Sequence, residues 1–179
     1  MGRRKQIDIV QHFKRIILRD IKPLSQILSE QVTNTGTFSP MISDILSFNI
    51  VSTVNKISLL KRIAEPERVD KEIVSEVVKE IKAMHHNIEA AEASPGLKAY
   101  GLSTIVVSKI LFEEYKEGVA IFEDVVTLLN SVDDPVRRSG VLRDVLYTVG
   151  LLRRYTRRGT HEIPENVLES LACRAVSYT

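Results

Sequence analysis

Metal binding is the first chemistry that the residue types suggest, because the sequence contains four histidines. His85 and His86 are adjacent, and Glu89 follows within one helical turn, so a helix would bring one His–Glu pair onto a face. Such a pair offers two ligands at most, whereas a zinc site takes three or four from the protein. For His12 and His161 the sequence identifies no partner. We therefore predict no metal site, and a solvated or helix-capping histidine pair.

Nucleophilic catalysis would fall to Cys173, the one cysteine of the sequence. It lies in the apolar helical segment 171–175, where a lone cysteine is more often a small core residue than a nucleophile. The sequence contains no Walker-type phosphate loop and no nucleophile elbow. We therefore predict no catalytic residue, no cofactor and no enzymatic activity. A single cysteine also fits a protein of the reducing cytoplasm.

Basic residues supply the remaining binding chemistry, because lysine and arginine neutralise phosphates and release counterions. Residues 1–24 hold seven Lys/Arg and two acids, a net charge of +5, and residues 136–158 hold seven Arg and one acid, a net charge of +6. Between them, residues 96–135 hold three Lys and seven acids, a net charge of −4, so the total of +2 hides the two basic segments. The candidate polyanion- or partner-binding residues are Arg3, Arg4, Lys5, Arg15, Arg19, Arg137, Arg138, Arg153, Arg154, Arg157 and Arg158.

Other interpretations of the basic segments stay open. The arginines at 153–158 would lie at a helix C-terminus, where cations complement the helix dipole, and Arg137 and Arg138 would be solvated. The segments could also bind an acidic protein, a second copy of the chain or an anionic membrane surface. Aromatic residues make up only 6% of the sequence and few lie among the arginines, which argues against a platform for stacking single-stranded bases.

Helices are predicted to position all of these residues. Apolar residues recur at three-and-four spacing from Arg4 to Ile21, which indicates a first helix, and Pro23 is predicted to begin a short second one. Ser39 and Pro40 are predicted to cap and begin a helix that ends near residue 62. Its predicted buried face consists of Ile42, Ile45, Leu46, Ile50, Val54, Ile57 and Leu60. Further helices are predicted to begin at Pro66, Pro95, Tyr115, Pro135 and Pro164.

Bulk composition limits the class of protein. The 179 residues are 44% hydrophobic and 27% charged, which is typical of a globular chain. Since no apolar run approaches about 18 residues, we predict no transmembrane segment, and no signal peptide is evident. The absence of tryptophan and the abundance of Val, Ile, Arg, Lys and Glu are features of thermophile proteins.

Three of the prolines begin segments that resemble one another. Seven residues after Pro66, Pro95 and Pro135 the sequence has an apolar residue, and eleven residues after each it has another. The first set is Ile73, Leu102 and Leu142, and the second is Val77, Val106 and Leu146. A repeated helical unit predicts stacked helices that offer a surface to a partner.

The stretch 114–126, followed by Asp133-Asp-Pro135, resembles the second helix of a tetratricopeptide-like repeat. Gly118 stands at the small position, where two helices approach closely, and Phe122 stands at the aromatic position that fills the groove between hairpins. Val106 and Val125 depart from the pattern, since the family has small residues there. The proline spacings of 29 and 40 also differ from the regular repeat of about 34. The resemblance covers residues 64–177 and is strongest over 95–150.

The predicted fold is therefore all-α, with helical hairpins stacked as a short tetratricopeptide-like α-solenoid, and an irregular helical bundle is the alternative. Residues 1–63 would form a basic amphipathic helix and a helical cap, and residues 64–179 the repeat region, within one continuous domain. The resemblance implies a non-enzymatic protein-interaction or scaffold module, and a homo-oligomer stays open. The alternative function is a nucleic-acid-binding subunit of a nucleoprotein complex that uses basic segments 3–22 and 137–158. The residues predicted to be buried between repeats are Leu102, Ile105, Val106, Phe122, Leu142 and Val145.

Overall fold

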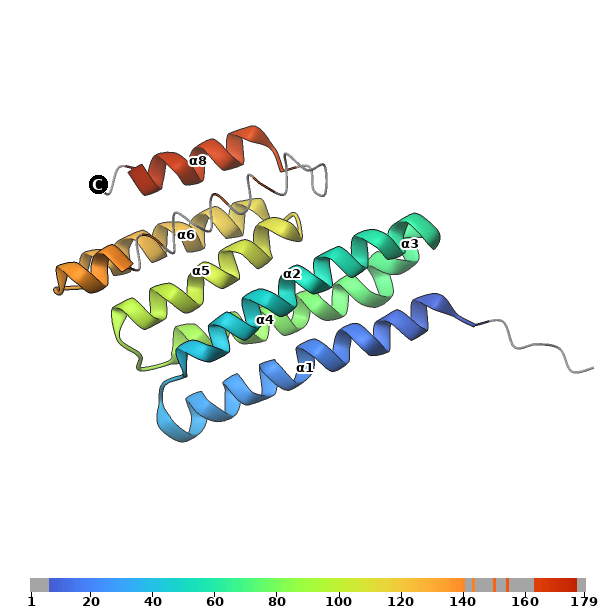
Figure 1. Ribbon diagram of the computed structural model, residues 1–179, viewed down its shortest axis with the longest axis horizontal. Coiled ribbons are helices and arrows are strands. Elements are labelled where there is room, and N and C mark those ends of the chain that lie inside the picture. Colours follow the sequence, from blue (N-terminus) through green and yellow to red (C-terminus); the bar gives the residue numbers. More distant parts are fainter. Residues whose placement is uncertain (1–6, 141–142, 144–149, 151–153, 155–162, 177–179) are drawn as a thin grey trace, which may run out of the picture.

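A computed structural model describes residues 7–140, 143, 150, 154 and 163–176 of the chain. Every regular element within these residues is helical, so the predicted all-α fold is confirmed (Figure 1). The elements are α1 (Ile9–Thr35), α2 (Pro40–Ile63), α3 (Pro66–Val69), the π-helix η1 (Asp70–Val74), α4 (Ser75–Ala90), α5 (Pro95–Leu111), α6 (Tyr115–Asn130) and α8 (Glu165–Val176). Residues 135–140 are also helical.

The predicted cap at Ser39 is confirmed, and Ser94 and Asp134 cap two further helices in the same way. Side-chain oxygens of Ser39, Ser94 and Asp134 accept hydrogen bonds from backbone N–H groups two or three residues further on, at 3.3, 3.4 and 2.9 Å. In each case proline takes the next position, where its missing N–H costs nothing. Local sequence alone therefore determines where α2, α5 and the helix at 135–140 begin.

Two predictions about the first helix were wrong. The helix begins at Ile9, after its N-cap Asp8, and not at Arg4. Pro23 lies inside α1 and does not begin a second helix. A proline within a helix costs about 3 kcal/mol. Burial of the apolar face on both sides of it, which includes Ile21 and Leu28, outweighs that cost.

In the stack of helices, α1 lies at one edge, α2 and α4 both lie between α1 and α5, and α6 and α8 follow α5 (Figure 1). Helix α1 packs against α2 and α4, both α2 and α4 pack against α5, α5 packs against α6, and α6 packs against α8. Helix α5 is central, because every residue from 101 to 111 is buried. A helix that is apolar on all sides needs neighbours on all sides. The tetratricopeptide-like stacking of these helices stays a prediction.

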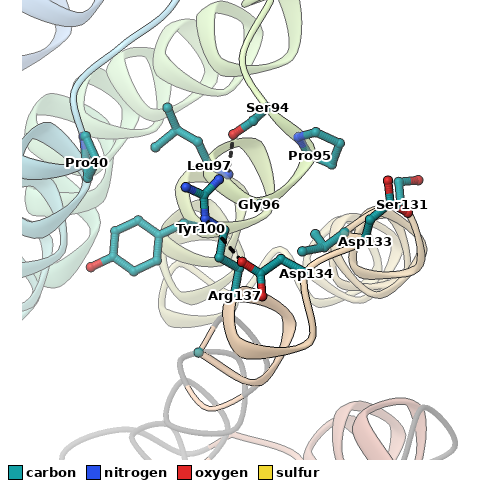
Figure 2. Close-up of a pocket in the computed structure, with 12 residues that line it drawn as sticks. Pro40, Ser94, Pro95, Gly96, Leu97, Tyr100, Ser131, Asp133, Asp134 and Arg137 are labelled. Atoms are coloured by element: carbon teal, nitrogen blue, oxygen red, sulfur yellow. Dashed lines mark hydrogen bonds and ion pairs between the residues drawn. The ribbon is translucent and has the colours of Figure 1, made fainter.

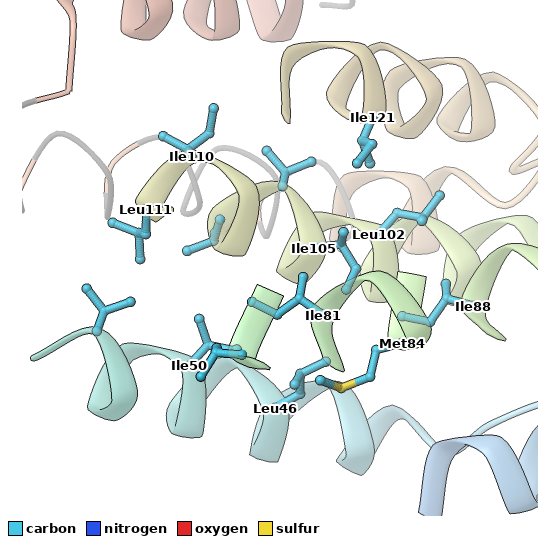
Figure 3. Close-up of a cluster of buried hydrophobic side chains, with 14 of the residues drawn as sticks. Leu46, Ile50, Ile81, Met84, Ile88, Leu102, Ile105, Ile110, Leu111 and Ile121 are labelled. Atoms are coloured by element: carbon cyan, nitrogen blue, oxygen red, sulfur yellow. The ribbon is translucent and has the colours of Figure 1, made fainter. Parts of the chain in front are cut away.

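One hydrophobic core joins the two predicted parts of the chain, since its buried residues run from Val10 to Ala175. At its centre, α2 contributes Leu46 and Ile50, α4 contributes Ile81 and Met84, and α5 contributes Leu102, Ile105 and Ile110 (Figure 3). Burial of Leu102, Ile105, Val106 and Phe122 is confirmed, whereas Leu142 and Val145 lie outside the described residues. The repeat positions Ile73 and Val77 are also buried. Ile45 is the exception on α2, because 40% of its surface is exposed.

Gly118 lies at a close approach of α5 and α6. A Cβ atom at this position would lie 2.6 Å from Cδ1 and 3.0 Å from Cγ1 of Ile110, which is itself buried. The predicted role of the small residue is thereby confirmed in geometric terms.

Replacing Gly118 with alanine is expected to lower the free energy of unfolding by about 1–3 kcal/mol, because the added methyl group overpacks the contact. The additional change Ile110→Val should recover part of this loss by removing the clashing atom. Gly140→Ala is the control. Nothing lies within 4 Å of its added Cβ, so helix propensity alone should act and stability should be unchanged or higher. Thermal and urea unfolding measure all three, and a Gly118→Ala variant as stable as the parent would contradict the close approach.

The turn between α5 and α6 holds a residue in the left-handed region, Glu113 at φ +66°. The backbone N–H of Glu114 donates to the Lys109 carbonyl at 2.9 Å, and that of Glu113 donates to the Ile110 carbonyl at 3.1 Å. This is the Schellman pattern, in which glycine is the usual left-handed residue. Glu113→Gly should therefore stabilise the protein by about 0.5–1 kcal/mol, whereas Ala120→Gly on the exposed face of α6 should destabilise it by about 1 kcal/mol. Equal losses for both variants in urea unfolding would refute this assignment.

Candidate protein-interaction face

Helix α2 is apolar on its exposed side as well as on its buried side. Phe48, Met41, Ile63 and Leu59 expose 75%, 66%, 65% and 59% of their surface, and Ile45 exposes 40%. Together with Ser52 and Asn55 they follow the spacing 41, 45, 48, 52, 55, 59, 63, which places all seven on one side of a helix. We call this set the α2 stripe. Its steps of four and three residues, which alternate up to Leu59, are those of a helix that packs along another helix.

The α2 stripe is a surface feature that was not predicted from the sequence. Ile45 was predicted to lie on the buried face with Ile42 and Leu46, whereas its side chain belongs to the stripe. A signal was present in the sequence, because Phe48 and Leu59 are large apolar residues that lie outside the core spacing of this helix. A large apolar patch that is exposed to water is typical of an interaction site.

A pocket of about 630 Å³ adjoins the N-terminal end of α2 (Figure 2). It lies where α2, α5 and the helix at 135–140 all begin, and its lining includes Pro40, Leu97, Tyr100 and Val132. The Tyr100 hydroxyl donates to the carboxylate of Asp44 on α2, which connects the pocket to the stripe.

The charges of this pocket favour an apolar or cationic group over an anion. Asp133 and Asp134 line it, and Nε of Arg137 lies 3.9 Å from Oδ2 of Asp134. Helix N-termini attract anions through their free N–H groups. Here Ser94 and Asp134 already accept hydrogen bonds from such groups, so fewer free N–H groups remain to bind an anion.

On α1, the basic residues lie on the solvent side. Arg15, Arg19 and Lys22 are exposed and recur at helical spacing, whereas Arg3, Arg4 and Lys5 lie outside the described residues. These three exposed cations could contact a polyanion without rearrangement.

The second basic segment is less uniform than its sequence suggests. Arg137 is exposed, but Arg138 donates from Nε and Nη2 to the Val132 carbonyl at 3.0 and 2.7 Å, so it stabilises the turn that follows α6. Arg143 and Arg154 are exposed, and Arg153, Arg157 and Arg158 lie outside the described residues.

The described cations of the two segments do not share a surface. Helix α1 lies at one edge of the stack, and α4 and α5 separate it from α6, which the helix at 135–140 follows (Figure 1). A single groove lined by Arg15 and Arg137 together is therefore not formed.

Lys109 is the buried cation of the molecule's described part, with 4% of its surface exposed. Its Nζ lies 2.7 Å from a carboxylate oxygen of Glu114 and 3.0 Å from one of Glu117. Burial lowers the pKa of Lys109, but the hydrogen bonds and charges of the two glutamates outweigh it, so the pKa is raised above 10.5. The hydrogen bond from Lys109 in turn lowers the pKa of Glu117. Because both partners neutralise it, Lys109 holds the α5–α6 turn together.

The remaining candidates from the sequence are the histidine pair and the single cysteine. Nε2 of His85 lies 3.0 Å from Oε1 of Glu89, as their spacing predicts, and no cluster of three His, Cys, Asp or Glu able to hold a metal occurs among the described residues. Cys173 is exposed, so its predicted place in the core was wrong. It stands on the outer side of α8, between the buried Leu171 and Ala175. Over the described ranges, no helix has the length and apolar character that crossing a membrane requires.

Comparison of the chain with protein-family models, with curated proteins and with solved structures finds no match. The tetratricopeptide-like resemblance therefore stays a prediction, and any proposal about function depends on the chain's own geometry.

Proposed function

We propose that this chain is a non-enzymatic protein-interaction module and that the α2 stripe is its binding surface. The exposure of Phe48, Met41, Leu59 and Ile63 along one side of a single helix carries the proposal. Burying such side chains contributes about 25 cal/mol for each Å² of apolar surface removed from water, so a partner helix laid along α2 would bind by the hydrophobic effect.

Rigid support favours the same conclusion. The opposite side of α2 is anchored in the core by Leu46, Ile50 and Leu60, each with no more than 1% of its surface exposed. A partner would therefore meet a preformed surface, and little conformational entropy would be lost on binding. The pocket beside Pro40 and Tyr100 extends this surface at one end.

Affinity capture tests the proposal. The chain and its Phe48→Glu variant would be immobilised and exposed to lysate of the cells that the chain comes from, and the bound proteins quantified by mass spectrometry. We expect at least one protein to be depleted about tenfold or more by Phe48→Glu, because a charge at the centre of an apolar interface removes a dominant anchor. His86→Glu, an exposed change on α4, is the matched control and should retain that protein. A capture profile that Phe48→Glu leaves unchanged would contradict the proposal.

Nucleic-acid binding is the second candidate function, and the exposed row Arg15, Arg19 and Lys22 on α1 favours it. Contacts between arginine and phosphate position a nucleic acid without reading its bases, so sequence preference would be slight. In a salt titration with RNA or DNA, Arg15→Gln with Arg19→Gln should weaken binding and reduce the salt slope by about one unit for each phosphate that the variant no longer neutralises. If the unmodified chain shows no salt-dependent binding at low ionic strength, this candidate is excluded.

A further inference from the structure

The α2 stripe has a pattern that is complementary to itself. Its ends are apolar, with Met41, Ile45 and Phe48 at one and Leu59 and Ile63 at the other, and its centre is polar, with Ser52 and Asn55. When two copies of the helix run in opposite directions, Phe48 of each faces Leu59 of the other, and Ser52 faces Asn55. Apolar then meets apolar, and polar meets polar, from Ile45 to Ile63, while Met41 lies beyond the end of the partner's α2.

We propose that the partner at the α2 stripe is a second copy of this chain, bound antiparallel about a two-fold axis near the level of Thr53 and Val54. The proposal rests on the proposed function and specifies its partner. A two-fold interface uses one patch twice and so requires the patch to match itself, which the stripe does.

Charge determines the direction of pairing. Asp44 is the one acid of the α2 sequence and lies in its first turns, whereas its cations Lys56, Lys61 and Arg62 lie in the second half. Lys56 and Lys61 already pair with Asp20 and Asp70. Arg62 is exposed, and within the described residues no ion pair holds it.

Antiparallel pairing brings Asp44 and Arg62 of different copies together. They are eighteen residues apart, about five helical turns, so they lie on the same edge of the stripe. A two-fold axis across the helices keeps that edge facing itself, so Asp44 of each copy meets Arg62 of the other. Parallel pairing would instead place the two Asp44 residues at the same level on opposite edges of the interface, far from Arg62, and align the two helix dipoles unfavourably.

Cysteine cross-linking tests the proposal directly. In a Cys173→Ser background, a variant with Asp44→Cys and another with Arg62→Cys would be mixed and oxidised. The antiparallel pair predicts that disulfide-linked dimers form in the mixture and not in either variant alone. Absence of linked dimers in the mixture while the chain is dimeric, or equal cross-linking of each variant alone, would overturn the proposal.

Sedimentation measurements supply the second arm. The unmodified chain should dimerise, Asp44→Arg or Arg62→Asp alone should weaken the dimer about tenfold, and the two changes combined should restore it. Phe48→Glu should raise the dissociation constant by about 100-fold or more while leaving the melting temperature of the monomer unchanged. A monomer at concentrations up to about 100 µM would overturn the proposal. If that monomer still captures a different protein through Phe48, the proposed function stands and only the second copy is refuted.

Discussion

Phe122→Ala is expected to lower the free energy of unfolding by about 3–5 kcal/mol. The Phe122 side chain is wholly buried on α6, so its removal leaves a cavity in addition to the forfeited burial energy. Urea unfolding followed by circular dichroism measures the change. Val136→Ala, at a site with 80% of its surface exposed, is the control and should cost less than about 0.5 kcal/mol.

A loss below about 1 kcal/mol for Phe122→Ala would contradict the packing of α6 against the core. It would also remove the physical reason for placing an aromatic residue at this position of the helical unit.

The Lys109 cluster gives the second large effect, and it is asymmetric. Replacing both Glu114 and Glu117 with glutamine should cost about 3 kcal/mol, because the buried ammonium group then has no counter-charge. This expected loss lies at the low end of the about 3–5 kcal/mol that breaking a buried ion pair costs, because the Glu117 side chain is 64% exposed. Lys109→Met should cost less, since the two carboxylates it leaves behind can be hydrated.

The pH dependence of stability separates the two sides of this cluster. The folded pKa of Lys109 is raised, so its contribution is complete below its usual value of 10.5 and is lost as the pH rises through the folded pKa. The folded pKa of Glu117 is lowered, so its contribution is present above its usual value of 4.5 and is lost as the pH falls through the folded pKa. Urea titrations across both ranges should show an alkaline loss of stability that Lys109→Met reduces, and the pKa of Tyr115, which burial raises, contributes to the loss that remains. An alkaline loss of equal size in that variant would contradict the assignment.

Local signals in the sequence predicted the starts of three helices that begin with proline. Ser39, Ser94 and Asp134 cap helices that proline begins, because capping depends on residues adjacent in the chain. Gly118 was predicted to permit a close approach, and the geometry at Ile110 confirms it.

Features that depend on tertiary contacts were not predictable in this way. Pro23 signals a helix start locally, but packing of α1 carries the helix through it. The π-helix at Asp70–Val74 has no residue type that announces it. Ile45 and Cys173 lie at the edges of apolar faces, and only the arrangement of neighbouring helices decides on which side of the boundary each one falls.

The candidate site, too, was predictable from the sequence only in part. The sequence identified the cations but could not show that Arg138 is occupied by the Val132 carbonyl, or that α4 and α5 separate the two basic segments. It also could not reveal the α2 stripe, because periodicity indicates an apolar side and does not indicate whether another helix covers it.

Site-specific photo-cross-linking in the cells that the chain comes from tests whether the α2 stripe is a protein-binding surface. A benzophenone amino acid would replace Phe48 in the α2 stripe or, as a control, the exposed His86 on α4. We expect illumination to link position 48 to a protein, either a second copy or another chain, and we expect no comparable product from position 86. Absence of any protein adduct at position 48, with the variant folded and present at its normal level, would contradict the claim that the α2 stripe is a protein-binding surface.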